Sequence, residues 1–272
     1  ACGKVRTMIF ALKKKEMALL LGAVMALMAC TVVLCDDADA RTEEVQSVIY
    51  FDDQGVGYVL NETDKTAKVV SFTGTSESTL YIDTFVKNLT ESYQVTTIGP
   101  QAFVDSRIVS VSLTGVETIS PQAFLGSTIN EIILDEALVS IGDDAFHECY
   151  HLVNVVKNGC KLNIAAGSTD NGGIAYYAID VQENPDRLVS VDDTKVFFID
   201  SEGDLNIVGA SGLLDHILLL PEYTVDGKKY DSYDIAPYAF EGYTAAERVY
   251  MTDSVKTIGE YAFRDCENVN EI

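Results

Sequence analysis

The sequence repeats one seven-residue phrase five times, and this repetition constrains its fold more than any other feature. The five copies are "TIGPQAF" (97–103), "TISPQAF" (118–124), "SIGDDAF" (140–146), "DIAPYAF" (234–240) and "TIGEYAF" (257–263). A catalytic motif is normally needed only once in a chain. A phrase that recurs in this way indicates a structural unit rather than an active site.

The spacing of the phrase indicates which kind of unit it is. Phe103, Phe124 and Phe146 are 21 and 22 residues apart, and Phe240 and Phe263 are 23 residues apart. A period of this length is typical of leucine-rich repeats, whose coils stack into a solenoid because one coil cannot bury its apolar face alone. We therefore expect one residue column of isoleucines and one of phenylalanines to form the core. This predicted spine consists of Ile98, Phe103, Ile119, Phe124, Ile141, Phe146, Ile235, Phe240, Ile258 and Phe263.

Between the phrases, apolar residues alternate with polar ones. The segments 108–113, 129–134 and 152–156 have this strand period, so we expect short strands that line up as a parallel sheet along one side of the solenoid. The outward positions of these strands vary from coil to coil, as on the binding face of a solenoid. The predicted binding face consists of Ser110, Ser112, Asn130, Glu131 and Asn154.

A longer repeat organises the whole chain. Residues 60–74 match residues 198–212 at an offset of 138, and both segments carry turn signals between apolar runs. We interpret them as β-hairpin lead-ins, each covering the end of one stack, so the fold class is mainly β with two arrays of coils. The predicted parts are a signal or anchor (1–40), a first cap (41–97), a first array (98–160), a linker (161–190), a second lead-in (191–234) and a second array (235–272).

The N-terminal segment predicts export. Three lysines precede an uncharged run from Met17 to Leu34, and a small-x-small site ends at Ala40, as in a secretory signal. Two alternatives remain open, namely a lipoprotein with Cys30 as the lipidated residue and an uncleaved membrane anchor. All three place residues 41–272 outside the cytoplasm. Met8 is a better start than Ala1, and the sequence stops within a repeat, so we expect a piece of a longer protein.

The repeats resemble those of a known family. "SIGDDAFHECYHLVNVV" and "TIGEYAFRDCENVNEI" are similar to the repeats of BspA-like leucine-rich-repeat surface proteins of bacteria. The resemblance covers about residues 48–272. It implies a secreted or surface-attached adhesion protein whose partners are extracellular proteins, cell surfaces or glycans. A structural spacer that supports a further domain is an alternative.

The sequence offers little chemistry for catalysis. Its formal charge of −23 disfavours nucleic acid, and it contains no nucleotide-binding phrase, so we expect no cofactor and no enzyme activity. One literal match exists: His147, Glu148 and His151 fit the H-E-x-x-H pattern of zinc hydrolases, which requires a helix. The repeat register places His147 and His151 at positions whose residue type varies from coil to coil, so the match is interpreted as chance. We therefore predict no metal site, and a zinc hydrolase remains the enzymatic alternative.

Overall fold

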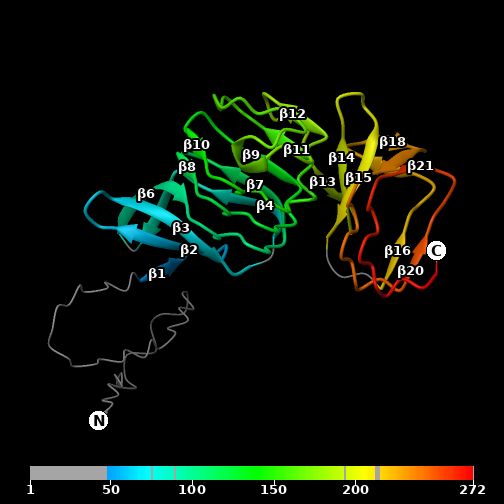
Figure 1. The fold of residues 1–272 in the computed structure, drawn as a ribbon, viewed down its shortest axis with the longest axis horizontal. Coiled ribbons are helices and arrows are strands. Elements are labelled where there is room, and N and C mark those ends of the chain that lie inside the picture. The colour runs from blue at the N-terminus through cyan, green and yellow to red at the C-terminus, as the bar shows by residue number, and fades with distance from the viewer. Residues whose placement is uncertain (1–47, 75, 89, 193, 212–214, 272) are drawn as a thin grey trace, which may run out of the picture. The chain divides into compact units, whose positions relative to one another are not determined.

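The structure is a computed structural model in which short strands make up almost all of the regular structure (Figure 1). The described residues are 48–74, 76–88, 90–192, 194–211 and 215–271. Within them a single 3-10 turn, η1 (Asn171–Gly173), accompanies the strands, and no helix is long and apolar enough to span a membrane. The predicted mainly β solenoid is therefore confirmed. The segment expected to direct export, including Cys30, lies outside the described residues.

A three-stranded antiparallel unit precedes the coils. This first lead-in consists of β1 (Ile49–Phe51), β2 (Val56–Asn61) and β3 (Thr66–Phe72). Its last strand, β3, pairs in parallel with β6 (Glu91–Ile98). Strand β5 (Phe85–Asn88) pairs with β6 in antiparallel orientation. An open end of a solenoid would present unpaired strand edges, so this hairpin acts as a cap.

The coils of the first array contribute strands to two sheets on opposite sides of a shared core. One sheet continues from β6 through β8 and β10, and the other has the order β12-β11-β9-β7-β4. All pairings between successive coils are parallel. The strands are β4 (Ser76–Ile82), β7 (Ile108–Leu113), β8 (Thr118–Ile119), β9 (Glu131–Ile133), β10 (Ser140–Ile141), β11 (Asn154–Val156) and β12 (Asp180–Gln182).

A column of phenylalanine rings runs through the first core. The centroids of Phe103 and Phe124 are 4.8 Å apart, and those of Phe124 and Phe146 are 4.9 Å apart, with ring planes within 8° and 7° of parallel. Ile98 and Ile119 are fully buried beside them. One coil therefore places its ring directly over the ring of the previous coil.

The residue before the alanine of each phrase adopts a left-handed backbone conformation. Its φ is 56° at Gln101, 58° at Gln122, 53° at Asp144, 60° at Tyr238 and 59° at Tyr261. The following alanine is buried in every copy. This bend directs the side chain of the left-handed residue toward the surface, which makes this position a surface row of the solenoid.

Residues 161–182, which belong to the predicted linker (161–190), close the first array. The carbonyl of Gly172 accepts a hydrogen bond from the Phe146 N–H at 2.9 Å, and Ile174 is buried in the first core. Strand β12 extends the sheet beside β11. Of the two tyrosines in this segment, Tyr177 is half-buried and Tyr176 is 49% exposed.

The second half of the chain repeats this topology. A second lead-in consists of β13, β14 and β15, and it continues into the parallel pairs β15–β19 and β19–β21 (Figure 1). Strand β16 pairs in parallel with β20. Strands β17 and β18 form an antiparallel hairpin. The rings of Phe240 and Phe263 stack at 5.3 Å. The strands are β13 (Ser190–Asp192), β14 (Lys195–Ile199), β15 (Leu205–Ala210), β16 (His216–Leu218), β17 (Tyr223–Val225), β18 (Lys228–Tyr230), β19 (Tyr233–Ile235), β20 (Arg248–Tyr250) and β21 (Val255–Ile258).

Three residues of the expected spine are less enclosed than the rest. Ile258 is 50% exposed, and Ile141 and Phe263 are half-buried. For Ile258 the expectation of a buried core residue is wrong in this structure. Among the described residues, Ile258 lies on the edge strand of its sheet, β21, which pairs with the strand of Ile235.

Candidate functional site

The strand face expected to bind partners is instead an internal interface. Ser110, Asn130, Glu131 and Asn154 are all buried, and only Ser112 is half-buried. The second lead-in covers this face. Val109 and Val153 of the first array accordingly pack in the second hydrophobic core, together with residues of β14 and β15. The expectation failed because alternation distinguishes the two faces of a strand but not solvent from another part of the chain.

A hydrogen-bonded ladder fills this interface. The Glu131 carboxylate accepts hydrogen bonds from Ser110 Oγ at 2.7 Å, Asn154 Nδ2 at 2.8 Å and the Val189 backbone N–H at 2.9 Å. Asn130 Nδ2 donates to the Val208 carbonyl at 3.1 Å. Burial raises the pKa of Glu131, and these three donors oppose the rise. The two arrays are therefore joined by specific polar contacts as well as by apolar packing, within one compact unit from Ser47 onward.

Beside this interface, five tyrosines from three segments form one surface cluster. We call Tyr150, Tyr176, Tyr177, Tyr238 and Tyr261 the tyrosine cluster. Neighbouring ring centroids are 4.7–5.4 Å apart: Tyr150 stacks on Tyr238 at 4.8 Å, and Tyr176 meets Tyr177 edge-on at 4.7 Å. Tyr176 is 49% exposed and Tyr261 is 48% exposed, so the cluster presents aromatic surface to solvent.

Arg264 holds the cluster together from within. Its guanidinium carbon lies 4.9 Å from the ring centroid of Tyr150 and 5.3 Å from those of Tyr238 and Tyr261. Glu241 pairs with Arg264 and fixes its position. Cation–π contacts of this kind restrain both the rings and the cation. Burial raises the pKa of Tyr177 to about 12, so its hydroxyl stays protonated at neutral pH.

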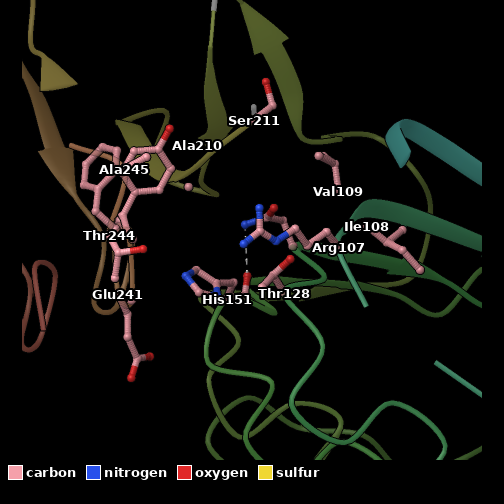
Figure 2. Close-up of a pocket in the computed structure, with 16 residues that line it drawn as sticks. Arg107, Ile108, Val109, Thr128, His151, Ala210, Ser211, Glu241, Thr244 and Ala245 are labelled. Carbon is pink, nitrogen blue, oxygen red and sulfur yellow. Dashed lines mark hydrogen bonds between the residues drawn. The ribbon is translucent and has the colours of Figure 1, made fainter. Parts of the chain in front are cut away.

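Two cavities are lined in part by residues of the first array. One, of about 700 Å³, has Tyr176 and Tyr177 in its wall together with Asp143, Asp144 and Asp170. The other, of about 370 Å³, lies between the first and second arrays (Figure 2). Figure 2 shows Arg107, Thr128 and His151 on one side of it and Ala210, Thr244 and Ala245 on the other.

The H-E-x-x-H string does not have the geometry of a zinc hydrolase. Residues 147–151 form turns, so the two imidazoles are not presented from one helical face. His147 is exposed near Glu148, whereas His151 lines the smaller cavity, and burial lowers its pKa to about 4. Among the residues described by the structure, no three His, Cys, Asp or Glu side chains are grouped as metal ligands.

The cysteines of the described residues occupy structural positions. Cys149, Cys160 and Cys266 are free thiols. Cys149 Sγ donates to the Phe124 carbonyl at 2.9 Å, and Cys266 Sγ donates to the Phe240 carbonyl at 3.0 Å, so both make the same contact in their coils. Burial raises the pKa of Cys149 to about 12, which suppresses its reactive thiolate form.

Sequence reasoning missed the tyrosine cluster. Tyr238 and Tyr261 occupy the left-handed surface position of their coils, where the first array carries Gln101, Gln122 and Asp144. This change from polar to aromatic residues was the available signal. These aromatic residues form a cluster only because the fold brings Tyr150 of the first array and Tyr177 of the linker to the same place.

Comparisons with known proteins agree with this repeat architecture. The family model described as "BspA type Leucine rich repeat region" matches in six copies, over residues 75–166 and 232–272. No curated protein matches the chain.

Among solved structures, the chain is similar to three bacterial proteins. A leucine rich cell surface protein from Faecalibacterium prausnitzii A2-165 is 17% identical, with 83% of this chain and 76% of that chain covered and a TM-score of 0.30. The pneumococcal vaccine antigen PcpA is 14% identical, with 83% and 70% covered and a TM-score of 0.32. The leucine rich repeat protein TpLRR of T. pallidum is 18% identical, with 80% and 68% covered and a TM-score of 0.34. The six matching repeats and the strand architecture together identify the chain as a leucine-rich-repeat protein of the BspA type.

Proposed function

We propose that the protein is a non-catalytic binding solenoid of the cell surface or the extracellular space, which holds extracellular partner proteins through the tyrosine cluster. The observation that carries this proposal is the gathering of five tyrosines at one surface, three of them in contact with Arg264. The N-terminal sequence, with its lysines before an uncharged run, supports export.

Tyrosine and arginine suit this role for physical reasons. Both are enriched among the residues that contribute most of the binding energy at protein interfaces. Tyrosine offers a large apolar ring and a polar hydroxyl, and it loses few rotamers on binding. In this protein Arg264 restrains the rings of Tyr238 and Tyr261 in the absence of a partner. These side chains would therefore lose less conformational entropy on binding.

The test is a binding measurement on purified protein against matrix proteins, followed by variants of the tyrosine cluster. Tyr261→Ala and Tyr176→Ala are expected to weaken binding of the captured partner by roughly tenfold or more, as for truncated hot-spot residues. Tyr81→Ala is the matched control, because Tyr81 is 55% exposed on β4 and lies outside the cluster. Equal losses in all three variants, or full binding by the cluster variants, would contradict the proposal.

The non-catalytic part has its own test. The turn conformation of residues 147–151 supports the absence of a zinc hydrolase site. Purified protein is expected to contain no stoichiometric zinc, and His147→Ala is expected to leave partner binding unchanged. Stoichiometric zinc that disappears in His147→Ala would instead favour the enzyme.

A further inference from the structure

The smaller cavity between the arrays has the features of a separate ligand site. Its volume of about 370 Å³ lies within the range of small-molecule sites, and both arrays contribute to its walls. Apolar surface comes from Val109 and Ala245, and hydrogen-bonding groups come from Thr128, His151 and Thr244. Small-molecule sites typically combine such apolar walls with a few polar groups that fix orientation.

Arg107 supplies the positive charge of this cavity. The structure describes three other arginines, and each of these is ion-paired: Arg187 with Asp180, Arg248 with Glu271 and Arg264 with Glu241. Arg107 forms no ion pair with another described residue. In a chain with a formal charge of −23, an arginine in the wall of a cavity that pairs with no described carboxylate is available to an anionic ligand.

The one carboxylate among the lining residues does not neutralise Arg107. Glu241 contributes to the wall, but its carboxylate is turned away from Arg107 and His151 (Figure 2), consistent with its ion pair to Arg264. The cavity and the tyrosine cluster therefore differ in their electrostatics. The negative charge of Glu241 is balanced by Arg264 of the cluster, whereas the positive charge of Arg107 is not balanced by Glu241.

The other polar groups favour a ligand rich in hydroxyls. Burial lowers the pKa of His151 to about 4, so its imidazole is neutral at physiological pH. A neutral imidazole and the threonine hydroxyls of Thr128 and Thr244 exchange hydrogen bonds with sugar hydroxyls without adding charge. The apolar wall at Val109 suits the C–H face of a sugar ring.

We infer that this cavity binds a carboxylated monosaccharide unit, with Arg107 on its carboxylate and Thr128, His151 and Thr244 on its hydroxyls. Arginine matches a carboxylate with two parallel hydrogen bonds, which gives the site its selectivity for the acidic sugar over a neutral one. This inference is independent of the tyrosine cluster.

The experiment is a titration of the purified full chain with glucuronate, glucose and acetyl-dialanine. Glucuronate is expected to bind at least about tenfold more tightly than glucose, since the arginine pair acts only on the carboxylate. Acetyl-dialanine offers a carboxylate from a peptide terminus and is expected to bind more weakly than glucuronate.

Variants assign the binding to this cavity. Arg107→Gln is expected to remove the preference for glucuronate over glucose and to leave glucose binding unchanged, and Thr128→Ala is expected to weaken both sugars. Both residues are exposed, so the fold should be retained. Arg248→Gln is the matched control for loss of one arginine, and Tyr261→Ala should leave sugar binding intact even if it abolishes protein binding. The inference is overturned if glucuronate does not bind, if Arg107→Gln keeps the preference, or if acetyl-dialanine binds as tightly as glucuronate.

Discussion

The Glu131 carboxylate accepts a hydrogen bond from the Val189 backbone N–H at 2.9 Å, across 58 residues of sequence. This contact joins the first array to the segment that enters the second lead-in. Glu131 is 1% exposed and has two further donors, Ser110 and Asn154. Loss of this buried carboxylate and its three hydrogen bonds should therefore change the free energy of unfolding by a measurable amount.

Glu131→Ala is predicted to lower the free energy of unfolding by at least about 2 kcal/mol. Removing the acceptor leaves the buried donors of Ser110, Asn154 and Val189 without their partner, and each such group costs about 1–3 kcal/mol. Chemical denaturation measures the change. Glu136→Ala, at an exposed position near the same strand, should cost little. A loss at Glu136 as large as the loss at Glu131 would contradict the role of the ladder.

Phe124→Ala is predicted to cost roughly 3–5 kcal/mol of unfolding free energy, because a large buried side chain is truncated. Phe124 is fully buried and touches a stacked ring on each side. His147→Ala changes an exposed residue of the neighbouring turn and is expected to cost almost nothing. Denaturation curves that reverse this order would show that the ring column is not the core of the coils.

The stability should depend on pH through His151. Burial lowers its folded pKa to about 4, below the ordinary value of 6.5, so the unfolded state binds more protons between these values. The contribution of neutral His151 is complete above about pH 6.5 and is lost as the pH falls toward 4. Because carboxylates also titrate at low pH, the measured quantity is the difference between wild type and His151→Gln in unfolding free energy at each pH. This difference should shrink on acidification.

Gly142→Ala is predicted to destabilise the protein by about 1–3 kcal/mol through overpacking. A Cβ at Gly142 would lie 2.5 Å from the Pro121 nitrogen in the preceding coil, where the backbone cannot yield easily. Ser120 occupies the same position one coil earlier, so Ser120→Ala is the control and is expected to change stability by less than about 0.5 kcal/mol. Thermal unfolding of the two variants compares them directly.

The sequence predicted what depends on local repetition. The period of 21 to 23 residues located the stacked rings of Phe103, Phe124 and Phe146. This inference succeeded because each coil makes the same contacts with its neighbour, so one register applies to all. The BspA-type family assignment followed from the same phrase and is confirmed by six matching copies.

The sequence did not predict what depends on contacts between the arrays. Alternation assigned Glu131 and Asn154 to the outward side of their strands, which is correct, but solvent does not reach that side. The tyrosine cluster escaped prediction for the same reason, since Tyr150 and Tyr238 stack although 88 positions separate them in the sequence. No period within the sequence encodes how one array meets the other.

The ladder at Glu131 limits how this protein can evolve. A free array tolerates the gain or loss of a whole coil, because each coil contacts only its neighbours. Here Glu131 and Asn154 lie on adjacent strands, and one added coil between them would increase their separation by a full strand spacing. The Glu131 carboxylate would then lose its contact with either Asn154 or Val189. The contacts of Glu131 therefore constrain the number of windings between Glu131 and the linker. Windings further along the chain are not subject to this constraint.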